Sequence, residues 1–180
     1  TLFRSTWAVA FISENMLVPF KLVMSELAKR GVNGTLITGT YLGFNSPKVF
    51  KELMKIPNLT VRLSEKTGFH AKGYIFNHED YQTILIGSAN FTRSALLKNC
   101  EWGLKVTSHE NGQLVEEVND QIKNNLSNSL ILTSSWIKEY EQNWQPIKNN
   151  PHLLLRKSKK ISPNQMQKEA LANLDALVKE

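Results

Sequence analysis

Two strand patterns follow one another between residues 69 and 102, and this stretch constrains the fold of the chain more than any other. In the first pattern, polar and aromatic residues alternate with small and apolar ones from His70 to residue 76. His70 and Lys72 are two positions apart, so the pleat of a strand sends both side chains to the same face. We therefore expect an imidazole beside a fixed ammonium group on one face of a sheet.

The second pattern is an apolar run at residues 83–86 that leads into Gly87, Ser88 and Asn90. A glycine lets another backbone segment come close, and Ser88 and Asn90, again two positions apart, project to one side. The two patterns together supply an imidazole, an ammonium group, a hydroxyl and an amide. These are the groups needed to hold and attack a phosphate.

In these residues the sequence resembles the phospholipase D superfamily. The signature of that superfamily is His-x-Lys, an Asp five residues after the Lys, and then Gly-Ser with an Asn shortly downstream. The matching residues are His70, Lys72, Gly87, Ser88 and Asn90. Glu101 falls where nucleases of the superfamily carry a glutamate that supports the histidine, and Asn77 departs from the signature at the Asp position, which the family uses structurally.

The resemblance implies a reaction that needs no metal and no cofactor. In the superfamily one histidine attacks phosphorus to form a phosphohistidine, and a second histidine protonates the departing alcohol. By that resemblance His70 is the nucleophile or the acid, and Glu101 orients it. The phosphate oxygens would be bound by Lys72, Ser88 and Asn90.

A complete site of this kind uses two His-x-Lys motifs, and the chain has one. None of the other histidines, His78, His109 and His152, is followed two residues later by a lysine. Small nucleases of the superfamily pair two chains, so that a twofold axis brings a second motif to the same phosphate. We therefore hypothesise a homodimer with one composite site at its interface.

Three features near the motif keep two interpretations each. Residues 91–98 have the pattern of a short helix, on which Arg93 either reaches a phosphate or is a solvated surface side chain. Glu101 could instead be a simple ion-pair or surface residue. Residues 39–43 contain glycines and hydroxyls at the end of a predicted strand, and either line a phosphodiester groove or form a plain strand-to-helix turn.

The composition indicates a globular protein with a basic surface. The chain has 180 residues, with 22 Lys and Arg against 16 Asp and Glu, which gives a formal charge of +6. This surplus favours polyanions such as nucleic acid, although many proteins of this size share it and bind none. Cys100 is the single cysteine, and we expect it to be a buried, inert thiol. No membrane-length apolar run and no signal peptide is seen, which favours a cytoplasmic protein without membrane contact.

The start of the chain reads as a βαβ unit. An apolar run at residues 7–12 predicts a buried strand, a helix should begin close to Pro19 and end at Gly31, and residues 35–38 predict a second strand. We therefore expect the α/β class and a phospholipase D-like fold, with a mixed, mostly parallel sheet flanked by helices on both faces.

The chain divides by composition into three parts. We assign residues 1–145 to the phospholipase D-like domain, 146–163 to a basic polar linker, and 164–180 to a helix leading towards a missing downstream domain. That last segment resembles the approach to the motor domain of DNA helicases, but the chain contains no phosphate-binding loop of that ATPase. Together with the abrupt start of the sequence, this suggests a piece of a longer protein. The closest layout is that of bacterial proteins with a phospholipase D-like nuclease module before a DEAD/DEAH-type motor.

The sequence thus predicts a metal-independent phosphodiesterase, and the resemblance implies a DNA nuclease domain of a helicase-linked repair or defence protein. RNA stays open as a substrate. One alternative is a non-catalytic module for DNA binding or dimerisation. Another is a phospholipid phosphodiesterase or transferase, against which the absence of a membrane helix or a basic amphipathic helix argues. The joint match of the motif residues argues against an ordinary α/β domain with His70 in its core.

Overall fold

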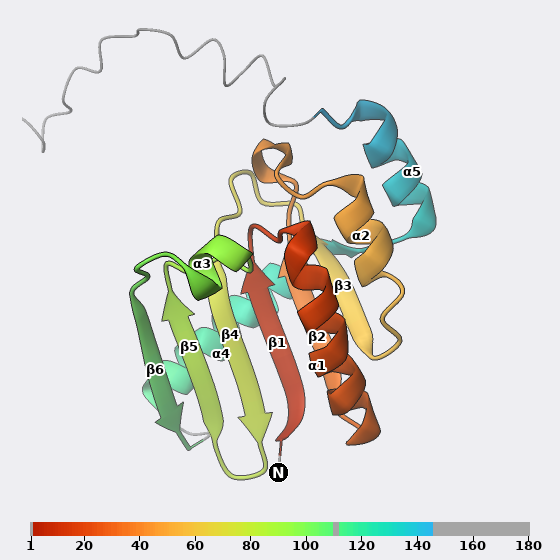
Figure 1. Cartoon of the computed structure of the whole chain (residues 1–180). Coiled ribbons are helices and arrows are strands. Elements are labelled where there is room, and N and C mark those ends of the chain that lie inside the picture. The colour runs from red at the N-terminus through yellow and green to blue at the C-terminus, as the bar shows by residue number, and fades with distance from the viewer. Residues whose placement is uncertain (1, 110–111, 146–180) are drawn as a thin grey trace, which may run out of the picture. The chain divides into compact units, whose positions relative to one another are not determined.

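The computed structural model describes residues 2–109 and 112–145, so the predicted linker and the final helix lie outside the described residues. Within this range the strands form one sheet in the order β6-β5-β4-β1-β2-β3-β7 (Figure 1). The strands are β1 (Leu2–Val9), β2 (Asn33–Thr38), β3 (Leu59–Ser64), β4 (Lys72–His78), β5 (Gln82–Gly87), β6 (Gly103–Ser108) and β7 (Ser129–Ile131). The helices are α1 (Leu17–Lys29), α2 (Pro47–Leu53), α3 (Arg93–Leu97), α4 (Gln113–Ser127) and α5 (Ser134–Asn143), with short 3₁₀ turns η1 (Glu14–Met16) and η2 (Tyr41–Gly43).

The sheet is mixed, as predicted, but the expectation of a mostly parallel sheet is wrong. Among the described strands β1 pairs in parallel with β2 and β2 with β3, whereas the other four pairings are antiparallel. Parallel neighbours need a crossover, which α1 and α2 supply. β4 and β5 are instead joined by a tight hairpin after His78, and a hairpin gives antiparallel neighbours. The opening βαβ pattern therefore holds only for the first three strands.

Helices cover both faces of the sheet, as predicted. α1, α2 and α5 lie on one face and α4 crosses the other (Figure 1). On the first face Trp7 of β1, Phe20 of α1 and Phe50 of α2 belong to one buried core. On the second face Val115 of α4 packs with Ile84 of β5. Across the described parts of the chain, no helix has both the length and the apolar character needed to cross a bilayer.

α1 forms for the reasons that its sequence suggests. Leu17, Phe20 and Met24 recur at spacings of three and four residues and are buried, which gives the helix an apolar stripe towards the sheet. Pro19 lies in the first turn, where a helix does not use its N–H group. Gly31 follows the helix at φ +70°, a conformation that glycine adopts without strain.

Asn45 ties the ends of β1 and β2 together, at the edge of the sheet that is formed by the carboxyl ends of these two strands. Its side chain is 1% exposed. Its Oδ1 accepts from the Ile12 N–H at 2.8 Å, and its Nδ2 donates to the carbonyls of Ala10 and Gly39 at 2.9 and 2.8 Å. β4 begins at this same edge because it runs antiparallel to β1. The predicted site residues therefore gather beside a rigid junction.

Candidate active site

His70 and Lys72 form a close pair at the start of β4. The Lys72 Nζ lies 2.8 Å from His70 Nδ1 and 3.0 Å from Nε2, and it donates to the His70 carbonyl at 2.9 Å. The imidazole is exposed, whereas Lys72 is partly buried. Burial lowers the pKa of Lys72, and the charge of Glu101 opposes that shift. The structure thus brings an accessible imidazole and a cation together, as the alternation in the sequence predicts.

Ser88 and Glu101 form a second pair, between the end of β5 and the start of β6. The Ser88 hydroxyl donates to the Glu101 carboxylate, and the Trp102 N–H donates back to the Ser88 Oγ at 3.1 Å. Asn99 Nδ2 donates to the other carboxylate oxygen at 3.0 Å. The hydrogen bonds from Ser88 and Asn99 lower the pKa of Glu101, and the charge of Lys72 adds to the shift. Glu101 is therefore held ionised near the cation of the first pair.

The close approach predicted at Gly87 is confirmed. A Cβ atom at this position would lie 2.3 Å from the Trp102 carbonyl oxygen and 2.9 Å from Gly103 Cα. No side chain fits there without a backbone shift. The absence of a side chain at Gly87 is thus what lets the segment carrying Glu101 lie beside Ser88.

Glu101 bonds to Ser88 and Asn99 rather than to His70 within the described residues. Its link to the first pair is electrostatic, through Lys72. The predicted action of Glu101 on His70 stays a prediction. The geometry does bring both pairs to the same edge of the sheet, where β4 begins and β5 ends.

Asn90 lies in a fixed segment after β5. The Tyr74 hydroxyl donates to the Ala89 carbonyl at 3.0 Å, and the Phe91 N–H donates to the Phe11 carbonyl at 3.0 Å. The Asn90 Oδ1 is buried and has no hydrogen-bond partner within the described residues. A buried amide in that condition remains available to a water or ligand donor.

Arg93 begins α3, the short helix that the sequence predicts after the motif. Thr92 caps this helix by accepting from the Ala95 N–H at 3.2 Å. The Arg93 N–H donates to Ser13 Oγ at 3.3 Å and its side chain is exposed. The choice between a phosphate ligand and a solvated arginine therefore stays open.

Asn77, the departure from the family signature, lies far from this edge. It is near the opposite end of β4, five residues after Lys72, or about 17 Å along a strand. Its Oδ1 accepts from Gln82 Nε2, which also donates to Asn119 of α4 at 3.1 Å. Asn77 thus joins the β4–β5 hairpin to α4, which is a structural role.

An aromatic cluster surrounds His70, and sequence reasoning missed most of it. The Phe11 ring lies 4.6 Å from Phe44 and 5.2 Å from His70, and the Tyr41 ring lies 6.0 Å from His70, all between ring centres. The Lys72 Nζ lies 5.9 Å from the centre of the Phe11 ring. The sequence analysis indicated this cluster only through residues 39–43, as a potential lining of a phosphodiester groove. Phe11 was missed because it reads as part of a buried strand.

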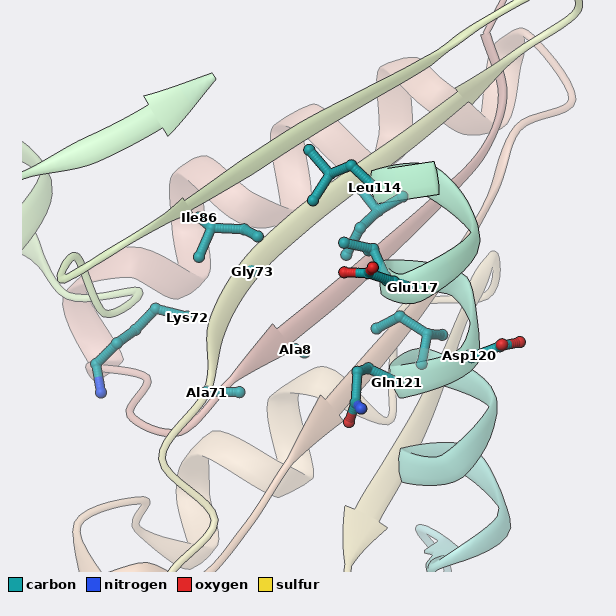
Figure 2. Close-up of a pocket in the computed structure, with 12 residues that line it drawn as sticks. Ala8, Ala71, Lys72, Gly73, Ile86, Leu114, Glu117, Asp120 and Gln121 are labelled. Atoms are coloured by element: carbon teal, nitrogen blue, oxygen red, sulfur yellow. The ribbon is translucent and has the colours of Figure 1, made fainter. Parts of the chain in front are cut away.

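A groove of about 670 Å³ lies between α4 and the strands β4 and β5, and Lys72 is among the residues that line it. In Figure 2 the Glu117 carboxylate points from α4 towards the sheet, whereas the Lys72 ammonium points away from α4. Ile86 and Leu114 make much of the lining apolar. A phosphate between α4 and the sheet would meet the Glu117 carboxylate, whereas the Lys72 ammonium is directed away from it, so this groove does not suit a phosphate.

The expectation that Cys100 is buried is wrong, because its thiol side chain is exposed. The sequence after it, from Glu101 to Val106, has the pattern of a strand. β6 begins only at Gly103. Cys100 therefore lies in the connection after α3, where no strand covers it.

Comparisons with known proteins agree with this fold. Residues 9–126 match the sequence profile of a family described as "Cardiolipin synthase, PLD-like domain". NucT from Helicobacter pylori is 21% identical over 72% of this chain and 82% of that chain, with a TM-score of 0.53. Nuc from Salmonella typhimurium, a phospholipase D family member, is 19% identical over 73% and 83%, with a TM-score of 0.54. Phosphatidylserine synthase from Haemophilus influenzae is 15% identical over 98% of this chain and 41% of that chain, with a TM-score of 0.53. No curated protein matches the sequence.

The profile covers more than half of the sequence, and the fold is shared with structures of the same class. The chain belongs to the phospholipase D superfamily. This assignment supports phosphodiesterase-type chemistry in general.

Proposed function

We propose that this protein is a metal-independent phosphodiesterase that cleaves DNA through a phosphohistidine formed on His70. The observation that carries the proposal is the contact of Lys72 Nζ with both His70 ring nitrogens at 2.8 and 3.0 Å. A cation in that position neutralises phosphoryl oxygens just where the imidazole would attack. The Ser88–Glu101 pair at the same edge adds a hydroxyl and an ordered carboxylate.

The proposed reaction proceeds in two displacements. In the first, a nitrogen of His70 attacks phosphorus, a P–N bond forms, the bond from phosphorus to the leaving oxygen breaks, and a second histidine protonates that oxygen. In the second, water attacks phosphorus, its proton passes to the second histidine, and the P–N bond breaks to return His70. Lys72, Ser88 and Asn90 bind the phosphoryl oxygens in both steps. The charge of Glu101 favours the protonation state that His70 needs in each displacement.

We propose that the second histidine is His70 of a second copy, in a homodimer. An exposed apolar patch beside the site supports this assembly. We name it the β6-edge patch, and its members are Ile86, Leu96, Trp102 and Leu104, all of which line one hollow of about 300 Å³ that also includes Glu101. Trp102 is 86% exposed, and monomeric proteins rarely leave a large aromatic side chain so exposed within an apolar patch. A second copy on this patch would cover it and would lie next to the Ser88–Glu101 pair.

We propose DNA as the substrate because of the excess of six positive charges and the resemblance of residues 164–180 to the approach of a helicase motor. A phospholipid phosphodiesterase or transferase is the second candidate. It is favoured by the similarity to phosphatidylserine synthase and by the description of the matching family. A module that binds DNA without cutting it is the third.

Cleavage in the presence of excess EDTA tests the proposal. Plasmid and single-stranded DNA are incubated with wild-type protein and with His70→Ala at matched dimer content. We expect cleavage that survives chelation and disappears in His70→Ala. DNA binding without cleavage by either protein would replace the proposal with the binding module, and transfer or hydrolysis of phosphatidyl groups in vesicles without DNA cleavage would replace it with the lipid enzyme.

The dimer is tested separately by sedimentation. We expect Trp102→Glu, which puts a charge on the β6-edge patch, to yield monomers with strongly reduced cleavage. Ile131→Glu is the matched control, because Ile131 is 58% exposed on β7, the opposite edge strand of the sheet. A wild-type protein that is monomeric and fully active would refute the hypothesis of a composite site at a dimer interface.

A further inference from the structure

The turn that follows β2 presents a strained and exposed segment next to His70. Tyr41 and Leu42 are 40% and 41% exposed. Leu42 has φ 57° and ψ 11°, which is left-handed backbone that a leucine rarely adopts. Such strain persists only where surrounding contacts impose it, and it is frequent at ligand-binding sites. The exposure of two large side chains here is therefore imposed by the fold.

The surrounding contacts are visible in the structure. Trp144 Nε1 donates to the Gly43 carbonyl at 2.8 Å, and the Tyr140 hydroxyl donates to the Asn45 carbonyl at 2.9 Å. The buried side chain of Asn45 also fixes the other end of the turn through Gly39, at 2.8 Å. The turn is thus held at both ends, and it presents the Tyr41 ring in a defined position.

The Tyr41 ring has support on one side and His70 beside it. It lies parallel to the Phe11 ring, with an angle of 2° between planes and 6.2 Å between centres. It makes an edge contact with His70, at 6.0 Å and 71°. A partly exposed, rigid aromatic ring next to an imidazole and an ammonium group combines a stacking surface with a phosphate-binding group.

We infer that Tyr41, backed by Phe11, is a stacking platform for the nucleobase next to the phosphate bound at His70, and that the site therefore takes single-stranded nucleic acid. This inference rests on the proposed nuclease function. Base stacking on an aromatic side chain accepts every base, and it adds to the electrostatic attraction of the backbone. In a duplex the faces of the bases are covered by their neighbours, so only an unstacked base can use this ring.

The contacts favour a base over a lipid acyl chain as the occupant of this platform. An acyl chain needs a long apolar channel, whereas Tyr41 is followed by a turn fixed through polar backbone groups. A larger apolar groove lies instead between α4 and the sheet, with Glu117 pointing into it (Figure 2). A flat ring beside Lys72 matches the alternation of base and phosphate along a strand.

Binding to two oligonucleotides tests the platform without requiring turnover. In a His70→Gln background, fluorescence anisotropy compares a short thymidine oligonucleotide with an abasic oligomer of the same length and charge. We expect Tyr41→Ala to weaken binding of the thymidine oligonucleotide by about 5- to 100-fold and binding of the abasic oligomer far less. Tyr41→Phe should keep most of the affinity. Tyr41→Leu, which keeps an apolar side chain without a ring face, should lose it.

Tyr81 supplies a matched control. It is 36% exposed, and its ring stacks on a histidine, His78, at 4.2 Å and 14°, but it lies at the other end of the sheet, in the β4–β5 hairpin. We expect Tyr81→Ala to bind both oligomers like the parent. An equal loss on both oligomers in Tyr41→Ala would overturn the platform, because it would show that Tyr41 acts through the phosphate site.

Three further outcomes separate this inference from the proposed nuclease. If wild type cuts no DNA but the Tyr41 variants show the expected dependence on bases, the nuclease proposal fails and the platform stands. If wild type cuts duplex DNA faster than single strands, or if Tyr41→Ala weakens binding to phosphatidylglycerol vesicles and not to the thymidine oligonucleotide, the platform is overturned.

Discussion

The central strands β1 and β2 and the outer strands β5 and β6 belong to one sheet but have different surroundings. The last five residues of β1 are all buried, and α1 and α4 pack against its opposite faces. β6 has no buried residue along its described length. Ser88 and Glu101 are attached to this outer pair, whereas His70 is supported by the central strands.

This difference separates stability from function within one site. The central strands bury most of their side chains, and the burial of apolar surface stabilises the folded state. The outer strands bury fewer side chains and keep apolar side chains exposed beside the Ser88–Glu101 pair. Regions with few buried contacts open first, and they are also the regions that can accept a partner or substrate. Substitutions in the two regions should therefore have different consequences.

The largest effect is expected in the central region, at Asn45, which joins the ends of β1 and β2. Asn45→Ala removes the side-chain partner of the buried Ile12 N–H and of the Gly39 carbonyl, and one of the two side-chain donors to the Ala10 carbonyl, which keeps the Thr38 hydroxyl. We expect a loss of about 3 kcal/mol or more in the free energy of unfolding, measured with urea. Cleavage by the remaining folded protein should also fall, because the segments beside His70 are released.

Asn58→Ala is the control for this substitution. Asn58 Nδ2 also donates to two carbonyls, those of Met24 and Val32, at 2.9 and 3.0 Å, but outside the site. It should lower stability without changing cleavage by folded protein. Equal effects of the two substitutions on cleavage would show that the junction at Asn45 does not position the site.

The sequence predicted the elements of this fold better than their pairing. α1 was predictable because the spacing of Leu17, Phe20 and Met24 encodes its buried face locally. The direction of β4 and β5 depends on the length of the connection between them, and an alternating strand looks the same in parallel and antiparallel sheets. The mostly parallel sheet was therefore an extrapolation from the first three strands.

The candidate site shows the same division. The motif residues could be found because they follow one another closely in the chain, although their roles stay predictions. Asn45 could not be found, because its contact with Ala10 joins positions 35 residues apart. Tyr41 was included only as one of residues 39–43, because its approach to His70 depends on the packing of segments about 30 residues apart. Asn45 lies between Phe44 and Ser46 in a stretch that has the pattern of an ordinary turn, and the neighbouring residues do not indicate that its side chain is buried.

A moderate effect on stability is expected at Gly87, within the outer pair. In Gly87→Ala the new Cβ would meet the Trp102 carbonyl oxygen at 2.3 Å, so β5 and the start of β6 must separate. We expect a loss of about 1–3 kcal/mol in urea unfolding and a large fall in cleavage, because Glu101 moves away from Ser88. Gly103→Ala is its control, since Gly103 pairs with Gly87 and a Cβ there finds only an ordinary contact at 3.8 Å. Cleavage retained in Gly87→Ala would contradict the need for this approach.

A smaller effect, of opposite sign, is expected at Lys72. Burial lowers the pKa of Lys72 in the folded protein, so the charged form is disfavoured by folding at neutral pH. Lys72→Met removes that cost and should leave stability unchanged or raise it by up to about 1 kcal/mol, while abolishing cleavage. The wild type should also gain stability as the pH rises through the lowered pKa, and the variant should lack this gain. A clear loss of stability in Lys72→Met at neutral pH would show that the cation stabilises the fold.

The smallest effect on stability is expected at Glu101, whose carboxylate lies at the surface. Glu101→Gln should leave the urea midpoint unchanged, yet it removes the charge that raises the pKa of Lys72. The pKa of Lys72 then falls further, and the cation is lost at a lower pH. We therefore expect the alkaline limb of kcat/KM to move to lower pH, with Glu139→Gln on α5 as a control that leaves it in place. An alkaline limb that does not move would mean that Glu101 and Lys72 are not coupled during cleavage, and that the outer strands contribute only binding surface to the site.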